Sequence, residues 1–151
     1  RGVYTLPEVW EDEFVSIQER YKRGVFALDT ALFLHDLTDR TPHKFHMAFP
    51  YGYNTSSPKA AGILCSCKKE PYYSLGIALV DTPAGNTVRA YNAEKTLCEI
   101  LKPISHTDIQ IITDAFKRYA GRKDKNIPLL SEYAHQLRVE KRLRPYLEVL
   151  L

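Results

Sequence analysis

Three cysteines carry the side chains best suited to metal binding or nucleophilic chemistry. Cys65 and Cys67 are one residue apart on a segment with strand character, where alternate side chains share one face. A structural zinc site needs a second such pair or suitably spaced histidines, and only Cys98 and scattered histidines remain. We therefore expect no metal, and we expect the cysteines to be small, buried core residues.

The cysteine count also indicates a cellular compartment. An odd number of cysteines in a chain of 151 residues argues for reduced thiols and a cytoplasmic location. No apolar run approaches the roughly 20 residues of a membrane helix, so no membrane contact is expected. A nucleophilic Cys98 beside His35 or His106 is an alternative, but core packing on an amphipathic helix is favoured.

The other titratable clusters have simple structural explanations. His43 and His46 are three residues apart on a predicted strand and would face opposite sides, a poor arrangement for a shared metal. Asp36 and Asp39 stand beside Arg40, a cluster that is typical of a helix end with a salt bridge. We expect Asp39 and Arg40 to be buried neighbours there.

Standard enzymatic motifs do not occur in the sequence. The seven glycines are scattered, whereas a P-loop or dinucleotide-binding turn needs clustered glycines to bring backbone amides to a phosphate. No acidic residue stands two positions before a lysine, the spacing of restriction-type nucleases. The sequence therefore predicts a protein that is not an enzyme, with no catalytic residues and no cofactor.

Basic residues gather in the last third of the chain, although the net charge is only +3. A patch of this kind can neutralise nucleic-acid phosphates, and the simpler alternative is a solvated helix face. Three acidic residues oppose them: Asp124, Glu132 and Glu140. The candidate DNA-contacting residues are Lys117, Arg118, Arg122, Lys123, Lys125, Arg138, Lys141, Arg142 and Arg144.

Tyrosine is unusually frequent, with ten residues. Tyr51, Tyr53, Tyr72 and Tyr73 stand near predicted loops, and aromatic rings with a polar tip favour interfaces. Half-buried positions around the rim of a small sheet are the slightly favoured alternative.

Two helices are predicted at the N-terminal end, after a short strand at residues 1–7. Trp10, Phe14, Ile17 and Tyr21 recur at helical spacing, and Gly24 ends this helix. A brief extended step at 25–27 precedes a second helix, for which Asp29 is the expected N-cap and which Pro42 stops.

The middle of the chain predicts four short strands, at 43–49, 62–67, 75–80 and 87–91. Turn residues separate them at 51–58, 68–71 and 81–86. The loop at 51–59 is the expected mobile segment.

The remainder is predicted to be helical. Asn92 caps one helix and Pro103 stops it, and Ser105 to Asp108 has the spacing of a capping box for the next, which runs to Gly121. A third helix starts at Pro128, and a final one covers 139–151 with a kink or restart at Pro145. The expected fold is one α+β domain with a small, mainly antiparallel sheet, N-terminal helices and a helical C-terminal half.

Two segments resemble AbiEi-type antitoxins. Residues 30–42, T-A-L-F-L-H-D-L-T-D-R-T-P, are similar to a T-A-L-x-L-H-x-L-T-D-R-x-P signature of that family. Residues 93–101, A-E-K-T-L-C-E-I-L, are similar to its E-[RK]-T-L-C-[DE]-I-L helix, and residues 146–151 to its usual ending. The residues that carry the two signatures are Thr30, Leu34, His35, Thr38, Asp39, Arg40, Pro42, Glu94, Thr96, Leu97 and Cys98.

The resemblance implies an antitoxin and transcriptional autoregulator of a bacterial abortive-infection (phage-defence) system, classed as type IV. Its partners would be operator DNA, bound by an N-terminal winged helix, and a nucleotidyltransferase-like toxin that it antagonises without a stable complex. Residues 1–7 would then be the end of the winged-helix domain or a linker, and 8–151 the toxin-neutralising C-terminal domain. A basic surface on this domain would assist DNA binding.

Two positions depart from the family pattern. Asp36 stands where many relatives have glycine, so that helix end is expected to differ, and Pro145 is unusual within the last helix. The rival interpretations are an enzyme of nuclease-like or transferase-like fold with a non-standard site, and an oligomerisation module. The oligomeric state is left open.

Overall fold

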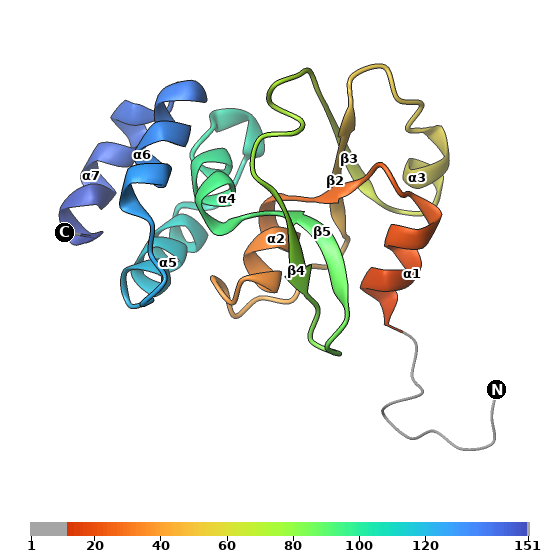
Figure 1. Cartoon of the computed structure of the whole chain (residues 1–151), viewed down its shortest axis with the longest axis horizontal. Helices are drawn as coiled ribbons and strands as arrows, with labels where there is room; N and C mark the ends of the chain where they lie inside the picture. The colour runs from red at the N-terminus through yellow and green to blue at the C-terminus, as the bar shows by residue number, and fades with distance from the viewer. Residues whose placement is uncertain (1–11, 151) are drawn as a thin grey trace.

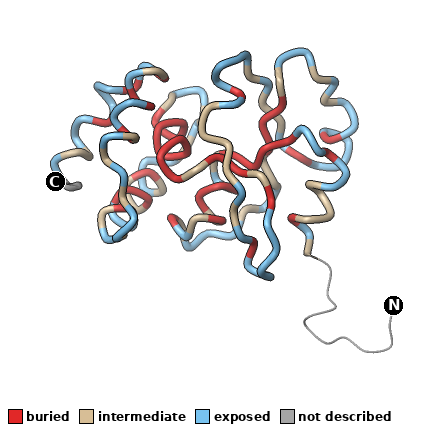
Figure 2. The backbone as a smooth tube through the Cα atoms, in the orientation of Figure 1, coloured by how far each residue is buried: buried red, intermediate tan, exposed pale blue. Residues whose placement is uncertain are grey.

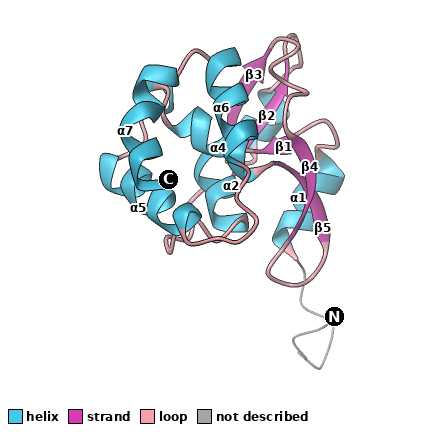
Figure 3. Ribbon diagram, turned by 60° about the vertical axis from the view of Figure 1, so that its left-hand side comes forward, coloured by secondary structure: helices cyan, strands magenta, loops and turns pink. Residues whose placement is uncertain are grey.

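The computed structural model describes residues 12–150, which form an α+β fold of a five-stranded sheet and seven α-helices (Figure 1). The last four helices gather on one side of the strands and α1 lies on the other, as Figure 3 also shows. The predicted fold class with its helical C-terminal half is therefore confirmed.

The elements are α1 (Glu13–Arg20), β1 (Val25–Phe26), α2 (Leu28–Leu34), β2 (His46–Pro50), α3 (Ser56–Ala60), β3 (Leu64–Lys68), β4 (Ile77–Asp81), β5 (Thr87–Tyr91), α4 (Ala93–Ile100), the 3₁₀ turn η2 (Pro103–Ser105), α5 (Ile109–Ala120), α6 (Ile127–Gln136) and α7 (Glu140–Leu150). The predictions for residues 1–7 and Trp10 lie outside the described residues.

The sheet is mixed rather than mainly antiparallel. Its strand order is β3-β2-β1-β5-β4; β1 pairs with β2 and β4 with β5 in antiparallel fashion. The pairs β1 with β5 and β2 with β3 are parallel. The prediction of a mainly antiparallel sheet is wrong. Helix α3 joins β2 to β3 as a crossover, which parallel strands require, where only a loop was predicted.

The helix α3 also corrects the predicted loop at 51–59. Pro58 suggested a turn, but it lies in the first turn of this short helix, where a missing backbone N–H is tolerated. The side chain of Asn54 accepts a hydrogen bond from the Ser56 backbone N–H at 3.0 Å and stabilises the helix start. The predicted strand at 43–49 begins only at His46, whose N–H donates to the hydroxyl of Thr30 at 2.9 Å.

Both ends of α2 differ from what the sequence predicts. Ala27 is the N-cap without a side-chain hydrogen bond, so Asp29 lies inside the first turn and its predicted capping role is wrong. At the C-terminal end, Asp36 has a φ of 58°, and the Leu37 N–H bonds to the Leu32 carbonyl at 2.9 Å. This is a regular Schellman motif, with aspartate at the left-handed position that glycine usually occupies, so the expectation that Asp36 alters this helix end is wrong.

The caps of the C-terminal helices are side chains that the sequence partly indicates. Asn92 accepts from the Lys95 N–H at 2.8 Å, which confirms the predicted cap of α4. The N-cap of α5 is Asp108, which bonds the Gln110 N–H, so the predicted capping box is wrong. The Ser105 hydroxyl instead donates to carbonyls that end α4, at Ile100 and Lys102. Helix α7 runs through Pro145 without the predicted restart.

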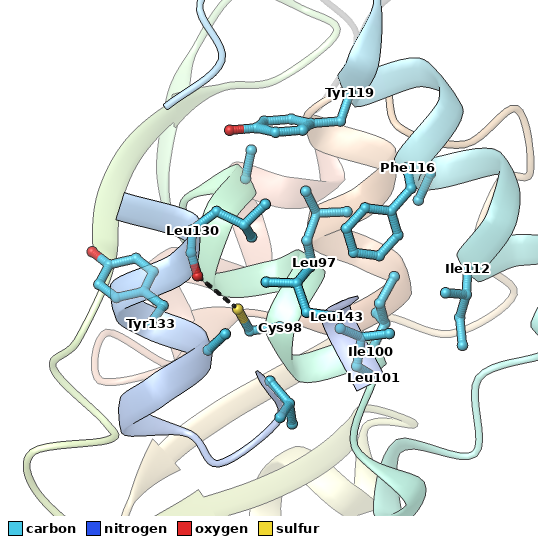
Figure 4. Close-up of a cluster of buried hydrophobic side chains, with 14 of the residues drawn as sticks. Leu97, Cys98, Ile100, Leu101, Ile112, Phe116, Tyr119, Leu130, Tyr133 and Leu143 are labelled. Atoms are coloured by element: carbon cyan, nitrogen blue, oxygen red, sulfur yellow. Dashed lines mark hydrogen bonds between the residues drawn. The ribbon is translucent and has the colours of Figure 1, made fainter. Parts of the chain in front are cut away.

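The core has two parts, one around the sheet and one among the helices. On β2, Met47 and Phe49 face the cluster that contains Phe14 of α1, while Ala48 faces the opposite cluster with Tyr91, as strand alternation requires. The helical cluster is centred on α4 and includes Leu97, Phe116, Leu130 and Leu143 (Figure 4). Figure 2 shows that the buried segments run through the central strands and α4.

Gly76 lies where the chain turns into β4 against α4. Its φ is +84°, and a Cβ there would lie 2.7 Å from the Lys95 Cβ. Its carbonyl accepts from the Asn92 N–H at 2.8 Å. Gly85 in the β4–β5 hairpin has a similar φ of +91° but open space around the missing Cβ.

These two glycines allow strain and overpacking to be separated. We expect Gly76→Ala to lower the free energy of unfolding by about 2–4 kcal/mol, from left-handed strain and the overpacked contact with Lys95. Gly85→Ala should cost only about 1 kcal/mol, because strain acts there alone. Urea unfolding followed by circular dichroism measures both, and equal losses would contradict the close contact at Gly76.

Candidate functional site

The two signature segments pack against each other and against the sheet. The His35 ring Nε2 donates to the carbonyl of Tyr91 at 2.8 Å, and the His35 carbonyl accepts from Arg122 Nη1 at 2.7 Å. Burial lowers the pKa of His35, which favours the neutral imidazole that makes this bond. The Thr96 hydroxyl donates to the Asn92 carbonyl at 2.8 Å. His35 thus joins the end of α2 to the end of β5, whereas Thr96 stabilises the first turn of α4.

Signature residues of the second segment are buried in the helical core. Leu97 and Cys98 are fully buried, and the Cys98 thiol donates to the Leu130 carbonyl at 3.6 Å (Figure 4). Burial raises the pKa of Cys98 to about 12, so a thiolate nucleophile is disfavoured. Core packing of Cys98 is therefore confirmed. Leu34 of the first segment is also buried, in the sheet cluster.

Four signature residues lie instead on the segment after α2, outside the core. Asp39 and Arg40 are both exposed, so the prediction that they are buried neighbours is wrong. The salt bridges among residues 12–150 do not include Asp36, Asp39 or Arg40, because the chain turns into an open segment before β2. Thr38, Arg40 and Pro42 line a hollow of about 350 Å³. Packing in the core therefore does not account for the presence of these four residues in the signature.

This hollow adjoins a larger cleft between the sheet and the start of α5. The cleft has a volume of about 500 Å³, and both are lined by Asp29, Leu64 and Ile111. Strands β2 and β3 form one wall, and the η2 turn with the residues after it forms another. The polar side chains that line the larger cleft are Asp29, His46, Ser66, Lys68, Glu99, Lys102, Ser105, His106, Thr107 and Asp108. Its size suits a small-molecule ligand.

A histidine and a serine meet on the strand wall of the cleft. His46 Nε2 and Ser66 Oγ are 2.7 Å apart, across the parallel pair β2–β3. Burial and the nearby Lys68 lower the pKa of His46 to about 4, so the ring is neutral at pH 7 and a weak base. Among the hydrogen bonds of residues 12–150, no carboxylate bonds the other ring nitrogen, as a nucleophile–base–acid arrangement would need. The geometry is that of a cross-strand contact.

A buried ion cluster forms the back of the cleft. Glu99 Oε2 lies 3.0 Å from Lys68 Nζ and 3.8 Å from Lys95 Nζ. Lys95 Nζ donates to the carbonyls of Tyr72 and Leu75, each at 2.8 Å, and lies 3.7 Å from the centre of the Tyr91 ring. Burial lowers the pKa of Lys95 to about 8, although Glu99 opposes the shift. The ammonium thus ties the segment before β4 to α4.

The predicted basic residues divide into structural and free ones. Arg118 pairs with Asp114 at 2.8 Å, and Arg122 pairs with Asp124 at 2.9 Å. Lys125 Nζ donates to the carbonyls of Ala120 and Arg122, so it stabilises the turn between α5 and α6. These side chains are already engaged in the fold.

The remaining basic residues are exposed on two elements and the turns beside them. Lys117 lies in the last turn of α5 and Lys123 in the following turn. Arg138, Lys141 and Arg142 line one shallow hollow at the α6–α7 junction, and Arg144 is exposed on α7. Arg138 has a φ of 60° in a second Schellman turn, where the Val139 N–H bonds to the Ala134 carbonyl at 2.9 Å.

The cleft was not predicted as a site from the sequence. His46 was considered only as a metal ligand, and Lys68 stood in a turn segment. The available signal was in α4: Lys95 and Glu99 are four residues apart on a helix whose apolar residues predict burial. Charges on a buried helix face need partners, and Lys68 supplies one from β3.

Other chemistry-bearing residues lie apart from the cleft. Cys65 is half-buried and Cys67 is exposed. The predicted burial is therefore wrong for Cys67, because β3 is an edge strand of the sheet. Residues 12–150 contain no group of three His, Cys, Asp or Glu side chains placed to hold a metal ion. Tyr73 is buried and Tyr53 half-buried, whereas Tyr51 and Tyr72 are exposed. No described helix is long and apolar enough to cross a membrane.

No family model matches the sequence, and no curated protein shows significant sequence similarity to it.

Tyr119 connects a signature residue to two further helices. Its hydroxyl donates to Glu94 Oε2 at 2.6 Å and accepts from the Asn126 N–H, the N-cap residue of α6, at 2.8 Å. Glu94 is only 8% exposed. Burial and the hydrogen bond to Glu94 raise the pKa of Tyr119, which keeps the hydroxyl a donor at all ordinary pH values.

Removing this hydroxyl should therefore be costly. We expect Tyr119→Phe to lower the free energy of unfolding by about 2–3 kcal/mol, because a buried carboxylate and a backbone N–H lose their partner together. Tyr51→Phe is the matched control. Tyr51 is 70% exposed, so the loss of its hydroxyl should lower the free energy of unfolding by less than about 0.5 kcal/mol. Similar midpoints for the two variants in chemical denaturation would refute the role of the Glu94 bond.

Proposed function

We propose that this chain is the C-terminal, toxin-neutralising domain of an AbiEi-type antitoxin and transcriptional autoregulator of a bacterial abortive-infection system of type IV. The proposal rests on the resemblance of residues 30–42 and 93–101 to the two family signatures. What supports it structurally is that these segments, although far apart in the chain, pack together: Leu32 and Leu37 of the first lie in one core cluster with Leu97 of the second. The cognate toxin would be a nucleotidyltransferase-like protein that the domain antagonises in the cytoplasm.

The exposed part of the first signature is the candidate surface for that antagonism. Thr38, Arg40 and Pro42 line the hollow next to the cleft, and Arg40 forms no ion pair with any residue from 12 to 150. A side chain that is dispensable for packing is free to contact another molecule. Arg40 is thus the most informative signature residue to change.

Growth rescue tests the proposal directly. Co-expression of this chain with the nucleotidyltransferase-like toxin encoded beside it should restore colony formation, and Arg40→Ala should reduce the rescue at least tenfold. Arg23→Ala, at an exposed arginine after α1, is the matched control and should rescue fully. Western blotting and circular dichroism verify that each variant is abundant and folded. Absence of rescue by the folded, abundant parent chain would overturn the proposal.

The basic residues at the α6–α7 junction are proposed to assist DNA binding. Arg138, Lys141, Arg142 and Arg144 are exposed, and none of them forms an ion pair with a residue from 12 to 150, unlike Arg118 and Arg122. Exposed cations of this kind add a salt-dependent, sequence-independent contribution to affinity. Helices α1 and α7 lie at opposite ends of the molecule, so basic residues after α1 provide a separate reference (Figure 1).

Charge reversal distinguishes this surface from a merely solvated helix. Arg142→Glu with Arg144→Glu should weaken binding to promoter DNA at least tenfold at low salt and reduce its salt dependence, while thermal unfolding stays unchanged. The control pair, Lys22→Glu with Arg23→Glu, introduces the same charge change beyond α1 and should have a clearly smaller effect. Fluorescence anisotropy measures both, and an unchanged affinity of the α7 variant would exclude the basic surface.

A further inference from the structure

Two tyrosine rings are exposed at the end of the sheet where β2 and β3 stop. These strands are parallel, so the segments that follow them lie side by side, and the Tyr51 N–H donates to the Lys68 carbonyl at 2.9 Å. Tyr51 is 70% exposed and Tyr72 is 38% exposed, and they are the exposed tyrosines among residues 12–150. An exposed ring offers a π-face to another molecule, which the packing of the chain itself does not use.

A lysine accompanies each ring. Lys69 Nζ lies 5.0 Å from the centre of the Tyr51 ring, and Lys102 Nζ lies 6.0 Å from the centre of the Tyr72 ring. The Tyr73 N–H donates to the Lys69 carbonyl at 3.0 Å, so Tyr72 lies within one turn of the chain from Lys69. The two ring–ammonium pairs therefore belong to one surface.

The turn before β1 brings two more cations to the same surface. Strand β1 is antiparallel to β2, with Val25 opposite Ala48, so the turn that precedes β1 lies beside the segment that follows β2. The Tyr73 hydroxyl donates to the Arg23 carbonyl at 2.6 Å, which ties this turn to the segment after β3. The side chains of Lys22 and Arg23 are both exposed.

The charge of this surface is positive. Its four free cations, none of which forms an ion pair with a residue from 12 to 150, are Lys22, Arg23, Lys69 and Lys102. Segments 21–24, 50–53 and 69–73 contain a single acidic residue, Glu70. Its carboxylate accepts from the Ser74 N–H at 3.1 Å and from the Ser74 hydroxyl at 2.6 Å. Four cations against one carboxylate attract a polyanion.

We propose that this aromatic–basic surface (Lys22, Arg23, Tyr51, Lys69, Tyr72 and Lys102) binds single-stranded nucleic acid. Bases stack on Tyr51 and Tyr72, and the four cations hold the phosphates between them. Stacking on an aromatic ring accepts every base, because every base has a π-face, and cations beside the rings follow the backbone. The proposal goes beyond the antitoxin assignment and does not depend on it.

The exposed rings distinguish a single strand from the other polyanions that four cations could attract. In a duplex the bases are stacked on one another, whereas the unstacked bases of a single strand can lie on tyrosine rings. An acidic protein surface would be attracted by the cations alone and would leave the rings unused. Lys22 and Arg23 are therefore expected to act on single strands and to contribute little to the binding of duplex promoter DNA. The basic α6–α7 junction has no exposed tyrosine among its described residues.

Fluorescence anisotropy on the intact chain tests the need for bases. The probes are labelled oligouridine and oligothymidine of twelve nucleotides, and their comparison tells RNA from DNA as the preferred strand. The references carry charge without bases: an abasic strand of the same length and polyglutamate. We expect at least one oligonucleotide to bind ten times more tightly, or better, than either reference. Chemical-shift mapping by NMR should place the perturbed amides at Tyr51, Lys69 and Tyr72.

Variants of the two rings separate stacking from charge. Tyr51→Ala with Tyr72→Ala should weaken binding of the oligonucleotide at least tenfold and leave its salt dependence unchanged, because the phosphate contacts remain. Tyr51→Phe with Tyr72→Phe is the matched control, since phenylalanine keeps the π-face, and it should bind as the parent does. Both residues are exposed, so circular dichroism should show every variant folded.

A lysine variant measures the contribution of the phosphates. Lys69→Gln should weaken binding several-fold and reduce its salt dependence, because one phosphate contact is lost. Lys44→Gln is the matched control and should bind as the parent does. Lys44 is also exposed, but it precedes β2 and therefore lies at the opposite end of that strand from Tyr51.

Three results would overturn the proposal. One is that the abasic strand or polyglutamate binds as tightly as both oligonucleotides. Another is that the alanine pair binds the oligonucleotide as tightly as the phenylalanine pair. The third is a duplex of the same length that binds more tightly than either single strand and perturbs the same amides. None of these affects the rescue assay, so the two proposals fail independently.

Discussion

The burial of helix α4 is the constraint on which the rest of the structure depends. All eight of its residues are buried, although three of them, Glu94, Lys95 and Glu99, carry charge. Each charge must be neutralised or hydrogen-bonded without water, since burying an isolated ion is prohibitively costly. The partners come from different parts of the chain: Tyr119 from α5, the Tyr72 and Leu75 carbonyls before β4, and Lys68 from β3.

These pairings explain why the surrounding segments have their observed shapes. The segment from Tyr72 to Gly76 has to approach α4 closely enough for its carbonyls to reach Lys95, and only glycine fits at the nearest point. Strand β3 has to present Lys68 at the end of the sheet, beside α4. The cleft is the space that remains where β3, η2 and the start of α5 meet around this cluster.

Much of the secondary structure could be predicted from the sequence, because apolar spacing and caps are local signals. The helices from Asn92 onward follow from Asn92, Gly121 and the apolar repeats, and β5 begins and ends as predicted. The mixed sheet could not be predicted, since Pro58 indicates a turn equally well in a loop or in the first turn of a crossover helix. The cleft also escaped prediction, because Lys68 and Glu99 are 31 residues apart and nothing local links them. Asp39 and Arg40 were predicted to be buried neighbours at a helix end. They are exposed because the chain leaves the core after Leu37.

The central position of α4 has a consequence for how the chain loses its structure. The helix contributes to the helical core through Leu97 and Cys98, and it is fastened to the sheet side through Lys95 and Glu99. Neither the sheet nor the helical half can therefore separate without exposing the apolar side chains around Leu97 and breaking the contacts of Lys95 and Glu99. Cooperative unfolding follows, with the amides of α4 exchanging their hydrogens only when the whole described domain opens. A protease cut between the strands and the last three helices would accordingly yield no stable fragment from either side.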